Sequence, residues 1–285
     1  MSRWRFAAAA DLAPVASALR EREWAYVPFS ARLAESTPRA RWPWPTWSVL
    51  VGGRPPAGSG PSPALLVTRS GLVLPALRGD LPLPRVLRPL VRRACGRLHS
   101  AMGLRTEVAR VQELLGRGYA VVDYLLMTVD ATSCRAAATP PELRLQRARP
   151  RDAKRLFDLQ RAYELEEVLL DGSRFNADEC LRLLRGGLQR ELVYFGAVHG
   201  HPVTKAGTNA RGFAVDQIGG VFTDQTRRRR GYGAAVMTVL LHTLFAAGKS
   251  ATLFVKPDNR AAIRLYENLG FVIRDQYRIC YYRAH

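Results

Sequence analysis

Residues 217–247 read QIGGVFTDQTRRRRGYGAAVMTVLLHTLFAA and contain a short apolar run, a turn rich in arginine and glycine, and a long apolar segment. The apolar run predicts a strand over residues 217–223, and the long segment predicts a helix over residues 231–247. The turn carries the pattern Arg228-x-x-Gly231-x-Gly233. Glycines let a backbone turn tightly and approach a ligand closely, and a helix N-terminus offers unpaired amides to an anion. The stretch therefore predicts a strand–loop–helix unit that binds a phosphate or pyrophosphate.

Two common phosphate-binding motifs do not fit this turn. No Gly-Lys-Ser/Thr follows the glycines, which excludes the loop of a nucleoside-triphosphatase, and the GxGxxG of a dinucleotide fold is incomplete. A short Arg-x-x-Gly-x-Gly pattern also occurs by chance. Its meaning therefore depends on the sequence around it.

A second motif begins 28 residues after Gly231 and reads Asn259-x-x-Ala262-x-x-Leu265-Tyr266-x-x-Leu269-Gly270-Phe271. With both motifs at this spacing, residues 142–285 resemble the GNAT superfamily of acyl-CoA-dependent N-acyltransferases. The order of predicted elements around the motifs agrees with that resemblance. One departure is the run of four arginines at 227–230, which is more basic than the family pattern requires.

The resemblance implies a binding site for acetyl-CoA as co-substrate. Backbone amides of the loop would surround the pyrophosphate, and the main chain of the preceding strand would pair with the pantetheine arm. The implied contacts come from the loop (Arg228, Arg229, Arg230, Gly231, Tyr232, Gly233, Ala234), the strand (Val221, Phe222, Thr223) and the later helix (Asn259, Ala262).

The resemblance also implies that Tyr266 lies near the thioester sulfur and protonates the departing thiolate. A phenol with a pKa of about 10 is suited to that role. The attacking amine must be neutral, and the candidate bases are Asp216, Glu166 and Glu167. A backbone amide of residues 221–223 would hold the oxyanion. Gly219 and Gly220 either widen the strand separation that admits the cofactor or mark a bulge.

Each of these residues also has a structural interpretation. Tyr266 shares a helix face with Ala262, Leu265 and Leu269 and could be a packed core aromatic; the motif favours catalysis. The glutamates near 164–167 suit a solvated helix face better than a base. Asp216 is equally suited to capping the loop that follows Arg211.

The chain divides by composition into two predicted domains, residues 1–135 and 142–285. The segment from Asp130 to Pro141 is rich in Ala and Thr and has linker composition. The second domain is predicted as a mixed, mostly antiparallel α/β sheet (α+β type) flanked by helices and ending in a strand pair at 271–283. The first half is predicted as a smaller accessory α/β domain, with a basic helix at 85–100, and could be a degenerate copy of the second without the glycine loop.

The charge is the outlier of the composition, with 43 Lys and Arg against 24 Asp and Glu, a formal net charge of +19. Such a surplus fits a polyanionic partner, and nucleic acid is one candidate. The surplus is divided almost evenly between residues 1–140 and 141–285, which argues against a dedicated nucleic-acid arm. Two alternatives to an N-acetyltransferase therefore stay open: a non-catalytic acyl-CoA sensor or scaffold, and a protein that binds or modifies nucleic acid.

The remaining predictions concern compartment and partners. The four cysteines at 95, 134, 180 and 280 form no CxxC or Cys/His pairing, so neither a metal site nor a disulfide framework is predicted. The sequence favours a cytoplasmic protein without a membrane span. The acceptor is predicted to be a primary amine on a small molecule, a protein lysine or a protein N-terminus, and a homodimer is one option.

Overall fold

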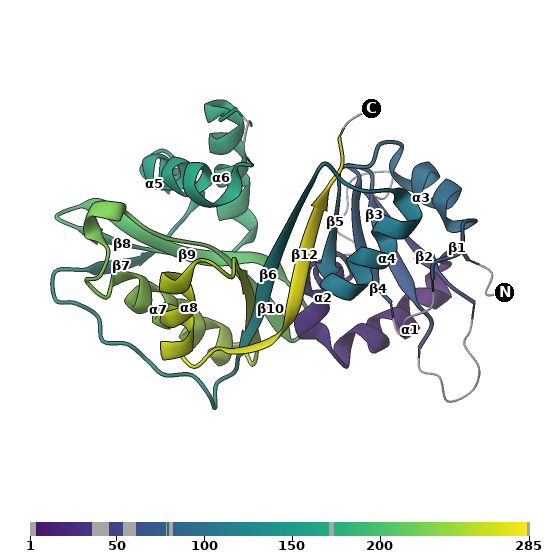
Figure 1. Ribbon diagram of the computed structural model, residues 1–285. Coiled ribbons are helices and arrows are strands. Elements are labelled where there is room, and N and C mark those ends of the chain that lie inside the picture. Colours follow the sequence, from purple (N-terminus) through teal and green to yellow (C-terminus); the bar gives the residue numbers. More distant parts are fainter. Residues whose placement is uncertain are drawn as a thin grey trace.

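The computed structural model describes residues 4–35, 46–53, 61–77, 79, 82–170 and 174–283, and these form two α/β lobes that share one twelve-stranded sheet (Figure 1). The strand order is β1-β2-β3-β4-β5-β12-β6-β11-β10-β9-β8-β7. Neighbouring strands are antiparallel except for two pairs, β4 with β5 and β10 with β11. The predicted mixed, mostly antiparallel sheet flanked by helices is confirmed.

The N-terminal lobe begins with a strand, two helices and three strands. Its elements are β1 (Arg5–Phe6), α1 (Ala9–Arg20), α2 (Glu23–Ala34), β2 (Trp47–Val51), β3 (Ala64–Thr68), β4 (Leu72–Ala76), α3 (Leu87–Cys95), β5 (Ser100–Leu104), α4 (Arg105–Leu115) and β6 (Ala120–Val129).

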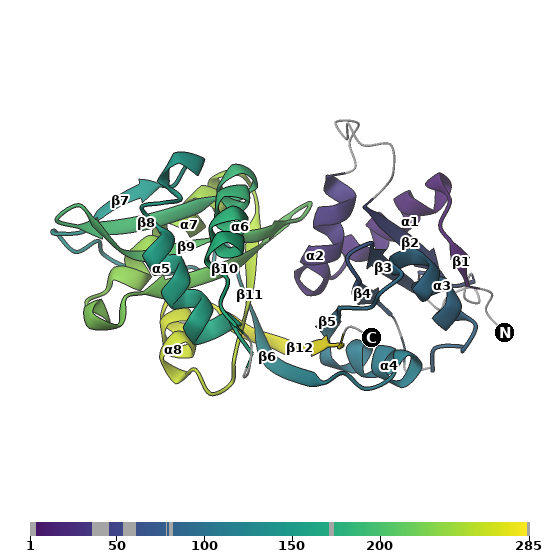
Figure 2. The ribbon, with the colours of Figure 1, turned by 90° about the horizontal axis from the view of Figure 1, so that it is seen from above.

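The C-terminal lobe repeats that order of strands and α-helices. Its elements are β7 (Arg144–Arg147), η1 (Pro150–Asp152), α5 (Phe157–Tyr163), η2 (Glu164–Val168), α6 (Ala177–Arg190), β8 (Val193–Val198), β9 (His201–Arg211), β10 (Val215–Thr223), η3 (Gln225–Arg227), α7 (Tyr232–Ala246), β11 (Ser250–Val255), α8 (Arg260–Asn268) and β12 (Val272–Tyr281). Helices α5 and α6 cover one face of its sheet, and α7 and α8 cover the other (Figures 1 and 2).

The last strand of each half pairs with the other half. β12, at the C-terminal end of the second half, pairs with β5 along Tyr277–Tyr281, and β6, at the end of the first half, pairs with β11 along Leu125–Val129. The two exchanged strands also pair with each other, from Val272 opposite Thr128 to Tyr281 opposite Ala120. The predicted strand pair at 271–283 is therefore wrong: this stretch is one long strand, because its partners come from the first half.

The basic helix predicted over residues 85–100 is also shorter than expected. α3 ends at Cys95, and Ser100–Leu104 form a strand between β4 and β12. Gly96 follows the helix at a φ of 66°, a left-handed conformation that stops α-helices and favours glycine. The strand that follows is short and buried, so it carries no alternating pattern that marks a half-exposed strand.

Helix α2 of the N-terminal lobe contacts the turn between β9 and β10 in the C-terminal lobe. The buried Glu23 carboxylate accepts hydrogen bonds from the backbone amides of Phe213 and Ala214, the second at 2.8 Å. The guanidinium of Arg20 lies 4.0 Å from the centre of the Phe213 ring. The two lobes are thus joined by side-chain contacts as well as by the exchanged strands.

The predicted linker lies along α7 and α8. The amide of Ala137 donates to Thr238 Oγ1 at 3.0 Å, and the amide of Arg135 donates to the Leu269 carbonyl at 3.1 Å. These contacts lie along α7, a mostly apolar helix with a fully buried core face that includes Val236, Leu240 and Leu244. In the described part of the chain, α7 and the other helices are too short or too polar to cross a bilayer.

A buried carboxyl group takes part in the core of the N-terminal lobe. Glu107 of α4 is 4% exposed, and its Oε1 accepts hydrogen bonds from Tyr26 Oη at 2.8 Å and from the Leu77 amide at 3.0 Å. Burial raises the pKa of Glu107 to about 8, against an ordinary value of 4.5. The protonated carboxyl therefore ties α4 to α2 and to the end of β4.

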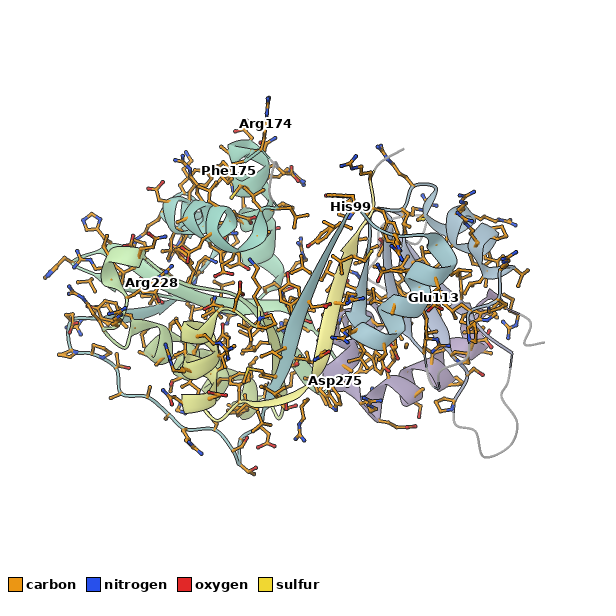
Figure 3. The ribbon with its side chains drawn as sticks, viewed as in Figure 1. His99, Glu113, Arg174, Phe175, Arg228 and Asp275 are labelled. Carbon is orange, nitrogen blue, oxygen red and sulfur yellow. The ribbon has the colours of Figure 1, made fainter. Side chains whose placement is uncertain are left out.

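This buried acid predicts a pH-dependent stability. The folded protein holds the Glu107 proton at pH values where the unfolded chain has released it, so stability falls as the pH rises from 4.5 to 8. The expected slope is up to about 1.4 kcal/mol per pH unit. E107Q is expected to remove this slope in urea unfolding measured at several pH values. E113Q, an exposed change on the same helix (Figure 3), is the control and should leave the slope in place.

Candidate functional site

A cleft opens where β10 and β11 diverge. The two parallel strands pair only from Val215 opposite Ser250 to Gln217 opposite Thr252, and beyond that point they separate. The separation leaves a cavity of about 210 Å³. Its walls come from β10, β11, α8, the turn after α5, and the exchanged strands β6 and β12, and include Tyr163, Glu167, Val221, Asn259, Ala262 and Tyr266.

A β-bulge shapes the β10 wall of the cleft. Gly219 lies opposite Gly207 and Phe222 lies opposite Lys205, so two residues of β10, Gly220 and Val221, face one residue of β9. Gly220 has a φ of 60°, which favours glycine. Of the two interpretations of this glycine pair, the structure contains the bulge, and it lies on the diverging part of β10.

The glycine loop connects the end of β10 to the start of α7 and places the first backbone amides of this helix near that end of the strand. Arg229 and Gly231 both adopt left-handed conformations, with φ of 64° and 79°, and Gly231 caps α7. The first amides of a helix have no intrahelical acceptor, and they carry the positive end of the helix dipole. A Cβ on Gly233 would lie 3.3 Å from Thr223 Oγ1, so glycine keeps the helix close to β10. The local geometry suits a phosphate group bound by main-chain amides.

The arginines of the loop have different environments. Arg228 Nη2 donates to both oxygens of Glu166 at 2.7 and 2.8 Å, and its Nε donates to the Thr223 carbonyl at 3.1 Å. Figure 3 shows Arg228 at the end of the C-terminal lobe that lies far from the N-terminal lobe. Arg229 and Arg230 are exposed. Tyr232 is buried and its hydroxyl donates to Glu142 Oε1 at 2.6 Å, so this residue offers a ligand its amide and not its ring.

Helix α8 and its N-cap bring three of the predicted residues, Asn259, Ala262 and Tyr266, into the cleft. Asn259 caps the helix by accepting from the Ala262 amide at 3.0 Å, and its Nδ2 donates to Glu167 Oε1 at 3.0 Å. Tyr266 lines the cleft about two turns beyond Asn259, 7% exposed and packed against Phe271. Burial, followed by the nearby Tyr163 and Glu167, raises the pKa of Tyr266 well above its ordinary value of 10. The phenol is therefore protonated at neutral pH and able to donate.

The three candidate bases lie in different places. Asp216 is fully buried, with Lys249 Nζ at 2.6 Å and Arg211 Nε at 3.3 Å. It sits on the paired part of β10, opposite Ala251, and not on the cavity wall. The structure thus gives Asp216 a structural role, as the paired anion at the closed end of the cleft. Glu166 is held by Arg228 and Gln225, outside the cavity wall.

Glu167 is the one of the three that lines the cavity. Its side chain is 24% exposed, and its Oε2 lies 3.6 Å from Lys256 Nζ. It comes from the π-helical turn η2, in which one extra residue per turn changes the direction of the side chains. Glu166 and Glu167 were equal candidates for the base in the sequence, because a run of glutamates does not reveal that the helix contains a π turn.

A second cavity, of about 220 Å³, lies between helices α5 and α6 and strands β8, β9 and β10. It shares Tyr163, Asn209, Gly219 and Gly220 with the cleft. Most of its remaining wall is apolar and includes the exposed Leu183 of α6. The polar members of this wall are Gln160, Glu191, Lys205 and Thr208. Gly219 and Gly220 of β10 therefore border both cavities.

Sequence reasoning missed Lys205 and Tyr163. Lys205 is 4% exposed; its Nζ donates to the Gly220 carbonyl at 2.8 Å and lies 4.5 Å from the centre of the Tyr163 ring. Burial lowers the pKa of Lys205 to about 8 and raises the pKa of Tyr163 to about 12. The chain has only four lysines against a large number of arginines, and this scarcity was the available signal that an individual lysine could have a specific role. Within the described ranges, no three His, Cys, Asp or Glu side chains gather as metal ligands would.

Comparisons with known proteins agree with this geometry. Residues 194–280 match the model of a family described as FR47-like protein. This range covers nearly all of the chain from β8 to β12 and therefore the β10, β11 and α8 walls of the cleft. No curated protein matches the chain.

Several solved structures share the fold. A Drosophila protein is 13% identical over 99% of both chains, with a TM-score of 0.68. A tandem GNAT protein from the clavulanic acid biosynthesis pathway is 12% identical over 99% of this chain and 98% of its own, with a TM-score of 0.53. A match to a GNAT-family protein from Novosphingobium aromaticivorans, 22% identical with a TM-score of 0.45, spans 57% of this chain and 65% of that one. The GNAT resemblance of the C-terminal half is confirmed. The fold match to the tandem GNAT protein extends over the N-terminal lobe as well.

Proposed function

We propose that this protein transfers an acetyl group from acetyl-CoA to a primary amine. The observation that carries the proposal is the cleft between β10 and β11, which begins near the glycine loop and ends at Tyr266. A ligand with a pyrophosphate at one end and a thioester at the other has the shape and charge that this path requires. The family-model match and the shared GNAT fold support acyl transfer from an acyl-CoA.

The cofactor contacts follow from the backbone. The amides of Gly231 to Ala234 would hold the pyrophosphate, with Arg229 and Arg230 as exposed cations beside it. The main chain of Val221, Phe222 and Thr223 is left without a β11 partner. The Phe222 and Thr223 carbonyls already accept from Thr204 Oγ1 and Arg228 Nε, so the remaining main-chain groups of this segment would meet the pantetheine amides.

The acceptor would approach from the second cavity, across the bulge of β10. Its neutral amine attacks the thioester carbonyl, and a C–N bond forms as the oxyanion develops. The C–S bond then breaks, and Tyr266 gives its proton to the leaving thiolate. Glu167 takes the proton that the amine loses, directly or through water. Glu166 and Asp216 remain with Arg228 and Lys249 as structural anions.

The apolar wall of the second cavity favours an acceptor with an apolar body and one amine. A polycation would require several carboxylates, and the described wall contains one, Glu191, whose Oε2 already accepts from Thr208 Oγ1 at 2.6 Å. A panel of amines should therefore rank arylalkyl and alkyl monoamines above polyamines.

The test is thiol release from acetyl-CoA with this panel, together with mass spectrometry of the acetylated product and calorimetry of acetyl-CoA binding. G231D places a carboxylate at the helix N-terminus and is expected to weaken acetyl-CoA binding by about tenfold or more. G248D is the matched control, because Gly248 has a similar φ of 71° at the other end of α7. Tight binding without thiol release for any amine would instead identify a non-catalytic acyl-CoA sensor.

A further inference from the structure

Lys205 occupies an unusual position for a buried cation. It lies on β9, lines the second cavity and directs its Nζ toward the bulge of β10. Burying an ammonium group costs several kcal/mol unless it finds compensating partners. Its Nζ lies 2.8 Å from a carbonyl oxygen and 4.5 Å from the centre of an aromatic ring, and neither of these partners is a carboxylate. Stability alone does not explain a buried cation without a carboxylate partner. Its effect on the orientation and polarity of the peptide group that it contacts is the better explanation.

That peptide joins Gly220 to Val221. In a trans peptide the C=O of one residue and the N–H of the next point in opposite directions. The Gly220 carbonyl points toward Lys205, on the side of β9 and the second cavity. The Val221 N–H therefore points away from β9, toward the cleft that Val221 lines. The bulge removes both residues from the β9 ladder, and β11 pairing ends at Gln217, so neither strand supplies the backbone acceptor that a regular ladder would.

We infer that Lys205 is a positioning residue for the acyl-transfer reaction: it fixes the Gly220–Val221 peptide so that the Val221 N–H donates to the thioester oxygen as it becomes an oxyanion. Its charge also polarises the peptide, which makes the N–H a stronger donor. This inference rests on the proposed function and deepens it. Preorganised amide donors of this kind are a large source of rate enhancement in acyl transfer.

The charged state of Lys205 matters for this role. The groups that face it are Tyr163 from α5, Glu164 from η2, Cys180 from α6 and, in the same cavity, Glu191. Burial lowers the pKa of Lys205 to about 8, with Glu164 and Cys180 acting in the opposite direction. The cation is thus present at neutral pH and is lost as the pH rises through 8.

Substitution at Lys205 tests the inference through turnover. K205M removes the charge and the hydrogen bond with little change in volume, and K205Q keeps a donor without the charge. K205M is expected to lower kcat by about 10- to 100-fold, less than the loss of an oxyanion donor itself. K205Q should be intermediate. The Kd of acetyl-CoA should change less than twofold, because the ground-state thioester is a weak acceptor.

The pH profile separates this role from general-base catalysis. Ionisation of the acceptor amine affects wild type and K205M equally. The two proteins are therefore compared through the ratio of the wild-type kcat to the K205M kcat at each pH. A positioning cation makes that ratio fall above pH 8, as the ammonium is lost. A neutral lysine acting as the base would make the ratio rise over the same interval, and that result would overturn the inference.

A spectroscopic measurement keeps the inference testable apart from turnover. Acetyl-CoA labelled with ¹³C at the carbonyl should show a lower C=O stretching frequency when bound to wild type than when bound to K205M. If acetyl-CoA binds and the frequency differs, but no amine is acetylated, the proposed function fails and the inference stands. Equal frequencies and equal kcat values in a folded K205M protein would refute the inference alone. Absence of acetyl-CoA binding to wild type would refute both.

Discussion

Y266F is expected to lower kcat for acetyl transfer by about 100- to 10,000-fold, the range for loss of a general acid. The phenol hydroxyl is the proton donor nearest the end of the cleft in the proposed reaction, and burial keeps it protonated. The ring of phenylalanine fills the same space beside Phe271, so the fold and the Kd of acetyl-CoA should be unchanged. Steady-state kinetics with calorimetry of acetyl-CoA binding would measure both quantities.

Y124F is the matched control for this substitution. Tyr124 lines the same cleft from β6, and burial likewise raises its pKa above the ordinary value. It has no role in the proposed mechanism, so Y124F should retain turnover within about threefold, less than 1 kcal/mol. Equal losses in the two variants would mean that cleft hydration, and not proton donation by Tyr266, limits the reaction.

Residues 142–285 alone are expected not to fold into a stable unit, despite containing the whole of the GNAT resemblance. This fragment lacks β6, which covers the open edge of β11. It also lacks Met127 and Val129, which are buried in the core beneath α7 and α8. Each such side chain contributes about 1.5–3 kcal/mol when buried, and a domain is stable by only about 5–15 kcal/mol. Circular dichroism melting of the purified fragment would measure the loss.

A longer fragment, residues 116–285, restores β6 and is the control. It gives β11 its partner and pairs β12 with β6 along the register seen in the full chain. This fragment should melt cooperatively and bind acetyl-CoA, whereas the shorter one should do neither. A cooperative transition in the 142–285 fragment would show that the exchanged strand is dispensable.

The predictions for the C-terminal lobe were most accurate where a short sequence motif determines both the local structure and the proposed ligand contacts. The strand, glycine loop and apolar helix over 217–247 appear at their predicted places. These features depend on residues close together in the chain. Tyr266 and Asn259 also line the cleft, as their motif implied.

The missed features depend on contacts between distant residues. The exchange of β6 and β12 has no local signal, because each strand has the same apolar composition with either partner. β5 is short, and its strand partners are 25 or more residues away in the chain. The sequence left a base role and a structural role for Asp216 equally open for the same reason: Lys249, its closest partner, lies 33 residues away.

The exchange also bears on how the chain folds during synthesis. β12 is translated after every other strand in the described chain, yet it occupies the centre of the sheet, between β5 and β6. The N-terminal lobe therefore emerges from the ribosome with β5 exposed, and it must wait for almost all the remaining chain before that edge is covered. Domains whose strands all come from one continuous stretch of chain can fold one by one as they emerge. Here each lobe needs a strand from the other half of the chain, so neither sheet is complete until both halves are synthesised. An exposed edge of this kind can pair with another chain, so β5 is an edge at which nascent copies could pair with one another before β12 arrives.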